Sequence, residues 1–483
     1  MKKLLSAVFV TLTLGACTTT EQSSDISSDN SVAPNSQSSP KNIIMIVGDG
    51  MGPAYTTAYR YFNDDPTTAE IEQSVFDKHY VGSSSTYPAK MSGYITDSAA
   101  AATALATGVK TYNDAISVDT NKKSLLTVLE WAKQQGKKTG VVVTSQINHA
   151  TPASYLSHNE NRNNYNAIAD SYIDNGIKAD VYFGGGWKYF IREDRNLVNE
   201  FKAAGFQYID DYKQLSTLKL NKPVLGLFGD SGLPWALDDK EKHRLSLMTK
   251  AATKQLKNPN GYFMLVEASQ IDWGGHGRDI GAAMAEMDDL AKTIAFLEEY
   301  VAKNPDTLVV LTADHSTGGL SIGRKTAMSN KDIHSKYLWQ PEILRTLPLS
   351  PETFAKTFAN NNLTLQQVNE VLKFEISSDD MALLLQSKKE GIKIYQQLSA
   401  EQKQKKWAPK AEGPILIAIK KIIDIKTNTG WGSISHSGTH TAVDVPVYAF
   451  GKGSEQFKGQ IDNTDIAKKI FTLLGKKHQH QHQ

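Results

Sequence analysis

The sequence predicts an α/β protein of three-layer αβα architecture, with a central, largely parallel sheet and a mostly helical insertion. The first observation is a series of apolar runs of strand length, at residues 42–47, 139–145, 179–186, 262–267, 307–315 and 445–451. The second is that segments with helical spacing of apolar residues lie between them, at residues 124–135, 163–175, 245–257 and 279–303. Strands that alternate with helices favour a doubly wound sheet, whose strands are apolar throughout because helices cover both faces.

The composition argues against functions that depend on overall charge. The chain of 483 residues has 53 Lys and Arg and 51 Asp and Glu residues, so its formal net charge at pH 7 is only +2. Proteins that bind nucleic acids or anionic membranes through charge carry a clear basic excess, so no nucleic-acid-binding surface is expected. Outside the N-terminus, no apolar run is long enough to span a bilayer.

Residues 1–16 are predicted to be a signal peptide. Two lysines give a positive start, and an apolar stretch follows at residues 4–14. The segment ends in Leu-Gly-Ala-Cys, which is similar to a bacterial lipobox with a lipidated Cys17; the alternative is an ordinary signal peptide followed by cysteine. Cys17 is the one cysteine of the chain, so no internal disulfide can form. We therefore expect an exported, periplasmic protein, attached to the outer membrane if Cys17 carries lipid.

Composition also divides the remaining chain into parts. These are a flexible tether at residues 17–40, a core at 41–324 and 431–475, an insertion at 325–430 and a tail at 476–483. The tether lacks the apolar side chains needed for a core. The insertion is rich in Lys and Gln and is helical in pattern over 351–372 and 379–404. The tail alternates His with Gln, which is typical of an affinity tag, so its histidines are left out of the site.

Ser98 is the candidate nucleophile. It follows an aspartate and precedes a run of alanines in TDSAAAATALATG, residues 96–108. Alanine has the highest helix propensity, and an Asp-Ser pair before such a run predicts a helix N-terminus. A hydroxyl placed there lies beside free N–H groups and the positive end of the helix dipole, where a phosphate group can bind. The alternative is a serine that only caps the helix.

Candidate metal ligands lie close to the apolar runs. They are Asp49, His149, Thr151, Glu267, Asp272, His276, Asp314, His315 and His440. Because parallel strands end at the same edge of a sheet, the fold would gather these side chains around Ser98. Oxygen and imidazole ligands without thiolates suit zinc and magnesium. Each residue taken alone has a structural alternative, such as a turn aspartate or a buried histidine, so the prediction depends on their joint occurrence.

Six motifs together resemble the alkaline phosphatases of marine and cold-adapted bacteria. They are VGDGMG, TDSAAAATALATG, HATP followed by Arg162, VEASQIDWGGH, TADHSTGG and GTHTAVD, within residues 42–323 and 431–451. The resemblance implies one zinc ion on Asp272, His276 and His440, a second on Asp49, Asp314, His315 and Ser98, and one magnesium ion on Asp49, Thr151 and Glu267. It also implies that Arg162 binds two phosphoryl oxygens and that the chain is a homodimer.

The activity implied by this resemblance is hydrolysis of phosphate monoesters, with broad specificity, through a phosphoserine at Ser98. His149 and Trp273 depart from the best-known enteric form, which has Asp and Lys there. We therefore expect His149 to bind the third metal less directly and Trp273 to weaken retention of product phosphate. In the family, an insertion such as residues 325–430 contacts a second subunit or covers the active site; the alternative is a surface excursion without a role.

Two other functions are weighed against this one. A phosphodiesterase or sulfatase-like relative would use a threonine or modified nucleophile and would lack the arrangement of Arg162 and magnesium. A surface lipoprotein that binds metal or phosphate without turnover would not need Ser98. The presence of Ser98 together with Thr151 and Glu267 favours the phosphomonoesterase.

Overall fold

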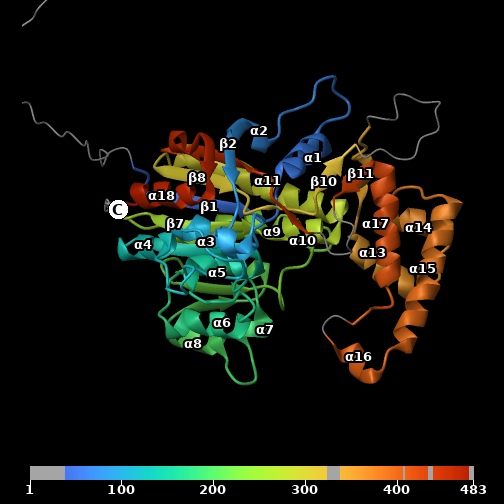
Figure 1. Ribbon diagram of the computed structural model, residues 1–483, viewed down its shortest axis with the longest axis horizontal. Helices are drawn as coiled ribbons and strands as arrows, with labels where there is room; N and C mark the ends of the chain where they lie inside the picture. Colours follow the sequence, from blue (N-terminus) through green and yellow to red (C-terminus); the bar gives the residue numbers. More distant parts are fainter. Residues whose placement is uncertain (1–38, 324–337, 406–407, 433–438, 478–483) are drawn as a thin grey trace, which may run out of the picture. The chain divides into compact units, whose positions relative to one another are not determined.

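The apolar runs of the sequence form the middle of a single ten-stranded sheet (Figure 1). The computed structural model describes residues 39–323, 338–405, 408–432 and 439–477. In spatial order the strands are β14 (Gly459–Asp462), β2 (Tyr80–Ser85), β13 (Val445–Gly451), β8 (Thr307–Thr312), β1 (Asn42–Gly48), β7 (Tyr262–Ala268), β3 (Lys138–Gln146), β4 (Val181–Gly185), β6 (Val224–Leu227) and β5 (Gln207–Ile209). The predicted signal peptide, Cys17 and nearly all of the tether lie outside the described residues.

The sheet is largely parallel, which confirms the predicted class. Only β13 runs antiparallel to its neighbours, β2 and β8. The other pairs are parallel. Strand β1 lies between β7 and β8, its residues 43–47 are completely buried, and residue 48 is also buried. Such a strand must be apolar on both faces, which explains the continuous run NIIMIV.

Alternate residues of β1 belong to two separate hydrophobic clusters, one on each face of the sheet. Ile43, Met45 and Val47 pack with the helices α3 (Ser98–Thr107), α4 (Val128–Gln134), α5 (Ala150–Leu156), α6 (Tyr165–Asp174), α8 (Leu197–Ala203) and α18 (Asn463–Leu473). Ile44 and Ile46 pack on the other side with α1 (Pro53–Asn63), α9 (Arg244–Gln255) and α11 (Ile280–Lys303). Side chains alternate across a strand, so the two clusters form the two interfaces of a three-layer fold.

The insertion packs on the second of these faces. Its helices are α12 (Glu342–Thr346), α13 (Pro351–Asn360), α14 (Leu365–Leu372), α15 (Ser378–Gln397), α16 (Ala400–Gln404) and α17 (Gly413–Thr427), drawn in orange in Figure 1. Buried side chains of α12, α13 and α17 share one hydrophobic cluster with α11. The short strands β10 (Leu320–Ile322) and β11 (Thr429–Trp431) pair antiparallel and bring the two ends of the insertion together. Among the described residues, no helix combines the length and apolarity of a membrane span.

Several element boundaries differ from the sequence expectation. The helix predicted over 351–372 is two helices, α13 and α14, because the chain leaves the helix at Asn361 and Thr364 caps a new one. The helix predicted from 124 begins at Val128, after a capping box formed by Thr127 and Glu130. Strand β11 begins at Thr429, just inside the range assigned to the insertion.

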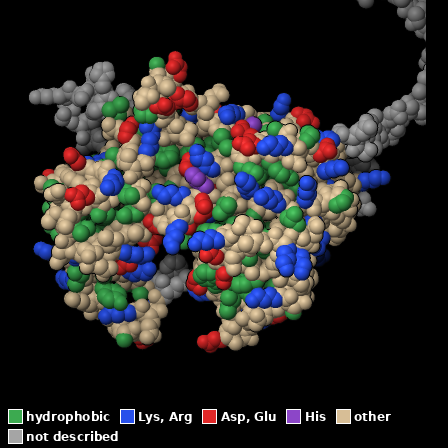
Figure 2. All heavy atoms as spheres, turned by 180° about the vertical axis from the view of Figure 1, so that it is seen from behind, with side chains coloured by type: hydrophobic (Ala, Val, Ile, Leu, Met, Phe, Trp, Pro, Cys, Tyr) green, Lys and Arg blue, Asp and Glu red, His purple; other side chains and the backbone are tan. Residues whose placement is uncertain are grey.

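On the face shown in Figure 2, acidic and basic side chains are interspersed.

Candidate active site

The predicted ligands gather at one edge of the sheet because the ends of β1, β7 and β8 are in register. Val47 of β1 is paired with Glu267 of β7 on one side and with Thr312 of β8 on the other. Asp49 and Asp314 each lie two residues beyond those pairs. Both carboxylates therefore lie at the carboxyl ends of the strands, where Glu267 is the second-last residue of β7 and where α/β sheets bind ligands.

Ser98 is the first residue of α3, and the residue before it caps the helix. The Asp97 carboxylate accepts a hydrogen bond from the Ala100 N–H at 2.9 Å, so the alternative of a serine that only caps the helix is wrong. Ser98 is 2% exposed, and its Oγ lies 3.1 Å from Nε2 of His315. The hydroxyl is thus held at the positive end of a helix and beside an imidazole.

Asp272, His276 and His440 form the first group of ligand-type side chains. Asp272 and His276 lie one turn apart on α10 (Gln270–Gly277), and His440 lies on the short strand β12 (His440–Thr441). Nε2 of His276 is 3.4 Å from Oδ2 of Asp272 and 3.1 Å from Nε2 of His440. Because Nδ1 of His440 donates to the Thr96 carbonyl at 2.8 Å, its Nε2 faces the other two side chains.

Asp49, Asp314 and His315 form the second group. Nε2 of His315 lies 3.5 Å from Oδ1 of Asp49 and 3.1 Å from Oδ2 of Asp314, and all three side chains are completely buried. The Gly50 N–H donates to Oδ1 of Asp314 at 3.0 Å, which fixes that carboxylate. One ligand atom from each of the three residues lies within 4.8 Å of the others, a spacing compatible with one cation.

Asp49 also belongs to a third group, with His149 and Glu267, whose ligand atoms again lie within 4.8 Å of one another. His149 is the N-cap residue of α5, and Thr151, the second residue of that helix, is completely buried. We expected His149 beside this site but less directly bound to its metal. The structure places it among the groups that are close enough to share a cation with Asp49 and Glu267.

Buried polar atoms without hydrogen-bond partners concentrate here. Among the described residues they include Oδ1 and Oδ2 of Asp49, Nδ1 of His149, Oγ1 of Thr151, Oε1 of Glu267 and Oδ2 of Asp314. Leaving such an atom unpaired costs about 1–3 kcal/mol, and more if it is charged. These atoms are all oxygens or an imidazole nitrogen, and bound cations of the zinc or magnesium type would satisfy them. The donor set therefore fits the metals that the motifs imply.

Burial shifts the pKa values of the three residues of the third group toward their neutral forms. Burial, reinforced by the charges of Asp314 and Asp272, raises the pKa of Asp49 well above its usual range. Burial also raises the pKa of Glu267 to about 7. Burial, together with the charge of Arg162, lowers the pKa of His149 to about 3, so this ring is neutral at pH 7 and free to donate a lone pair. A cation would return both acids to their ionised form.

Arg162 and Trp273 flank this cluster. The Arg162 guanidinium donates through Nη1 to Oδ2 of Asp97 at 2.9 Å, which holds it next to the start of α3. Trp273 follows Asp272 on α10, and its ring meets His149 edge-on with the ring centroids 6.0 Å apart. The sequence motifs predicted both residues at the site. In the structure Arg162 contacts Asp97, next to Ser98, and Trp273 contacts His149.

Two residues at the site were missed by sequence reasoning. Asp97 was noted only as part of the helix start, and its second role, pairing with Arg162, depends on a contact across 65 positions of the chain. Thr317 lies within the TADHSTGG motif, and its hydroxyl contacts both Asp272 and His315. A threonine next to known ligand types is a weak pattern, because threonine occurs in many buried strands.

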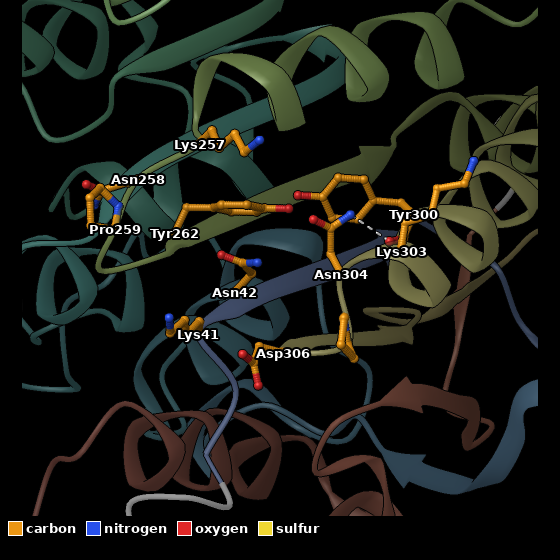
Figure 3. Close-up of a pocket in the computed structure, with 11 residues that line it drawn as sticks. Lys41, Asn42, Lys257, Asn258, Pro259, Tyr262, Tyr300, Lys303, Asn304 and Asp306 are labelled. Atoms are coloured by element: carbon orange, nitrogen blue, oxygen red, sulfur yellow. Dashed lines mark hydrogen bonds between the residues drawn. The ribbon is translucent and has the colours of Figure 1, made fainter.

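A separate pocket of about 350 Å³ lies at the opposite edge of the sheet (Figure 3). Asn42 and Tyr262, which begin β1 and β7, line it together with Asp306, which precedes β8. Its charged side chains include Lys41, Lys257 and Lys303. None of the predicted site residues lines this pocket, so it is distinct from the cluster around Ser98.

The fold and the cluster define a class: α/β enzymes with a buried serine surrounded by carboxylates and imidazoles. The model of the alkaline phosphatase family matches residues 40–476. Alkaline phosphatase 3 of Bacillus subtilis (strain 168) is 44% identical over 443 residues, which cover 90% of this chain and 89% of the relative. The repressible alkaline phosphatase of Saccharomyces cerevisiae is 30% identical over 481 residues, covering 90% and 81%.

Solved structures give the same result. The cold-active alkaline phosphatase from the psychrophile Shewanella sp. is 45% identical with a TM-score of 0.79, covering 90% of this chain and 99% of that one. The alkaline phosphatase of Thermus thermophilus is 25% identical with a TM-score of 0.73, covering 94% and 97%. The chain belongs to the alkaline phosphatase family. It is a phosphomonoester hydrolase, as the motifs predicted, and the family is metal-dependent.

Proposed function

We propose that the chain hydrolyses phosphate monoesters of broad structure through a phosphoserine at Ser98, with two zinc ions and one magnesium ion bound. The observation that supports this most strongly is the concentration of unpartnered buried oxygen and nitrogen atoms beside a serine at a helix N-terminus. A phosphate group needs that combination of positive potential and a hydroxyl within reach. When bound, the cations would lower the pKa of the serine hydroxyl and stabilise the departing oxygen.

The three groups of side chains correspond to three metal positions. One zinc ion would be held by Asp272, His276 and His440, and the other by Asp49, Asp314, His315 and Ser98. The magnesium ion would be held by Asp49, Thr151 and Glu267. Because His149 lies in the same group, and a neutral imidazole suits zinc better than magnesium, metal analysis of the purified protein tests this position. Two zinc ions and one magnesium ion per chain are expected; three zinc ions would make His149 a ligand.

The residues of the chain have separate tasks in the reaction. Ser98 loses its hydroxyl proton as Oγ forms a bond to phosphorus and the bond from phosphorus to the ester oxygen breaks, and the departing oxygen takes up a proton to leave as the alcohol. Water then attacks the phosphoserine, releases phosphate and returns a proton to Oγ. Arg162 binds two phosphoryl oxygens, and its bond to Asp97 orients the guanidinium toward the N-terminus of α3. Holding the Arg162 guanidinium in place before phosphate binds lowers the entropic part of the activation barrier.

Location and assembly are part of the same proposal. Export to the periplasm and lipid attachment at Cys17 rest on the N-terminal sequence, which lies outside the described residues. A homodimer rests on the family resemblance. The insertion then either contacts the second subunit or covers the active site. Mass spectrometry of the mature N-terminus tests the lipid, and sedimentation tests the dimer.

The test of the activity compares an aryl phosphate monoester with the matched diester. The purified protein is assayed with zinc and magnesium, after chelation, and after each metal is restored. We expect a strong preference for the monoester that is lost on chelation and recovered with zinc. A preference for the diester would place the chain with the phosphodiesterase-like relatives, and phosphate binding without turnover would support the binding-protein alternative.

A further inference from the structure

Thr317 is a buried residue that touches ligand-type side chains of two different groups. It lies on β9 (Ser316–Thr317), and it is completely buried. Its hydroxyl donates to Oδ1 of Asp272 and lies 3.1 Å from Nδ1 of His315. Asp272 belongs to the first group described above and His315 to the second, and the two are close enough that one ligand atom from each of Asp272, His315 and His440 also lies within 4.8 Å of the others. The hydroxyl therefore bridges the two proposed zinc positions without being a ligand itself.

The Thr317 hydroxyl has a single proton, so donating it to Asp272 determines how the hydroxyl contacts His315. A threonine hydroxyl has one hydrogen to donate and two lone pairs to accept with. An ionised carboxylate can only accept, so the hydroxyl proton goes to Asp272. The contact with His315 must then be an N–H at Nδ1 that donates to the threonine oxygen. In a neutral imidazole this leaves the lone pair on Nε2.

Nε2 of His315 is the atom that faces the centre of the site. It lies 3.1 Å from Oγ of Ser98, 3.1 Å from Oδ2 of Asp314 and 3.5 Å from Oδ1 of Asp49. The ring thus presents a lone pair where a cation would bind. If the proton were instead on Nε2, this atom could not serve as a ligand to a cation at the centre of the site.

The backbone of Thr317 ties together the segments that carry the other ligands. Its N–H donates to the Gly50 carbonyl at 3.1 Å, next to Asp49. It is paired with His440 in the two-stranded sheet of β9 and β12. Its carbonyl accepts from the Tyr55 hydroxyl at 2.7 Å. A shift of this one residue would therefore move ligands of both groups together.

We infer that the Thr317 hydroxyl is a positioning group that fixes the tautomer of His315 and the orientation of Asp272, and so couples the two zinc positions. The inference rests on the proposed function, since it needs zinc at both groups. Hydrogen bonds to metal ligands typically contribute about 10–100-fold in metal affinity. Removal of the hydroxyl should therefore weaken zinc binding at both positions.

The experiment uses three variants of the full chain. Thr317→Val keeps the shape and removes the hydroxyl, and Thr317→Ser keeps the hydroxyl. Thr312→Val removes a buried hydroxyl that contacts the backbone carbonyls of Pro446 and Ala313. Zinc dissociation constants are measured on metal-stripped protein by competition with a coloured chelator. Urea unfolding of the stripped proteins reports folding, and kcat and KM are measured with saturating zinc.

We expect Thr317→Val to lose about 10–100-fold in zinc affinity at both positions. Thr317→Ser and Thr312→Val should bind zinc as the unchanged protein does, and stripped Thr317→Val should be no less stable than stripped Thr312→Val. Wild-type zinc affinity in Thr317→Val would overturn the inference. Equal losses in the valine and serine variants, or a loss matched by destabilisation of the stripped protein, would also overturn it. If the unchanged protein needs no zinc for turnover, the proposed function fails as well.

Discussion

At the scale of single residues, the site contains buried side chains with oxygen or nitrogen atoms that lack hydrogen-bond partners among the described residues. Asp49 is the clearest case, because it is completely buried and, among the described residues, neither carboxylate oxygen has a hydrogen-bond partner; the nearest imidazole nitrogen, Nε2 of His315, lies 3.5 Å from Oδ1. Neighbouring polar side chains do have hydrogen-bond partners. Asp97 accepts from Arg162 and so orients its guanidinium. The Thr96 carbonyl accepts from His440 and so orients its ring. The open atoms are those that a cation or a phosphate would contact.

Trp273 allows a test of product retention at this scale. Trp273→Lys adds a cation beside the phosphate site, and a hydrogen bond to a charged group contributes about 1.5–3 kcal/mol. We therefore expect the inhibition constant for inorganic phosphate to fall about tenfold or more. Trp273→Leu is the matched control, since it removes the ring without adding charge, and it should leave phosphate inhibition close to that of the unchanged protein. Unchanged inhibition in the lysine variant contradicts this explanation.

Glu130 gives a prediction for the pH dependence of stability, away from the metal groups. Burial opposes its ionised form, but hydrogen bonds from His158 and Lys178 outweigh burial and lower the pKa of Glu130 to about 2. The ionised Glu130 carboxylate therefore stabilises the folded chain fully above its unfolded pKa of about 4.5. This contribution is lost as the pH falls toward the folded pKa of about 2. Glu130→Gln should cost about 1–3 kcal/mol at pH 7, and the cost should shrink between pH 5 and pH 3.

Urea unfolding at each pH measures this difference. The control is Glu299→Gln, which changes an exposed glutamate on α11 and should change stability little. A cost that stays constant across the pH range would show that the carboxylate charge of Glu130 is not what stabilises the fold.

At the scale of elements, the insertion helix α17 supports the segments that carry the first metal group. Lys420 of α17 donates to the Gly277 carbonyl at 2.6 Å, at the end of α10 and next to His276. Asp424 of the same helix accepts from the Trp431 indole, which packs on the turn at Gly318. That glycine has a φ of +76°, and a side chain there would come within 2.9 Å of the Trp431 ring.

Lys420→Met tests whether this support matters for function. The variant removes the bond to the end of α10 and keeps most of the side-chain volume, so it should cost about 1.5–3 kcal/mol in unfolding free energy. It should also release zinc faster from the group that includes His276. Lys421→Met, on the same helix but exposed, is the control. Equal zinc release from both variants would contradict a supporting role for α17.

The sequence was a good guide to elements whose pattern is local. The central strands and Asp49, Asp314 and His315 at their ends follow from short apolar runs and the residues after them. Strand β2 was not predicted, because its sequence YVGSSS has no apolar pattern, and it is held by pairing with β13 and β14. The proximity of His149 to Glu267 and the two contacts of Thr317 depend on segments far apart in the chain, which no local pattern specifies.

At the scale of the whole molecule, the site is assembled where the central strands β1, β7 and β8 end, together with residues of α3, α10 and the short strand β12. The described residues from 39 onward belong to one compact unit, and the ligands come from segments between Asp49 and His440. Correct folding therefore assembles the metal groups, and bound cations should in turn stabilise the folded chain. A ligand that binds only the folded state adds about 4 kcal/mol at a thousand times its dissociation constant.

Metal removal measures this coupling. Chelated protein should unfold at a lower urea concentration than zinc-loaded protein, and added zinc should restore the midpoint in a concentration-dependent way. Magnesium alone should restore less, since it binds reluctantly to imidazole-rich groups. An unfolding midpoint that is independent of zinc would contradict the assignment of the buried cluster as a metal site.

Ser98 is the proposed nucleophile, and Ser98→Ala tests this role directly. We expect turnover of a phosphate monoester to fall at least about a thousandfold, because no other hydroxyl can form the phosphoserine. Zinc binding and phosphate binding should persist, since the other ligands and Arg162 are unchanged. Ser216→Ala, an exposed serine, should keep full activity. If Ser98→Ala retains substantial turnover with zinc bound, the nucleophile lies elsewhere and the proposed mechanism is wrong.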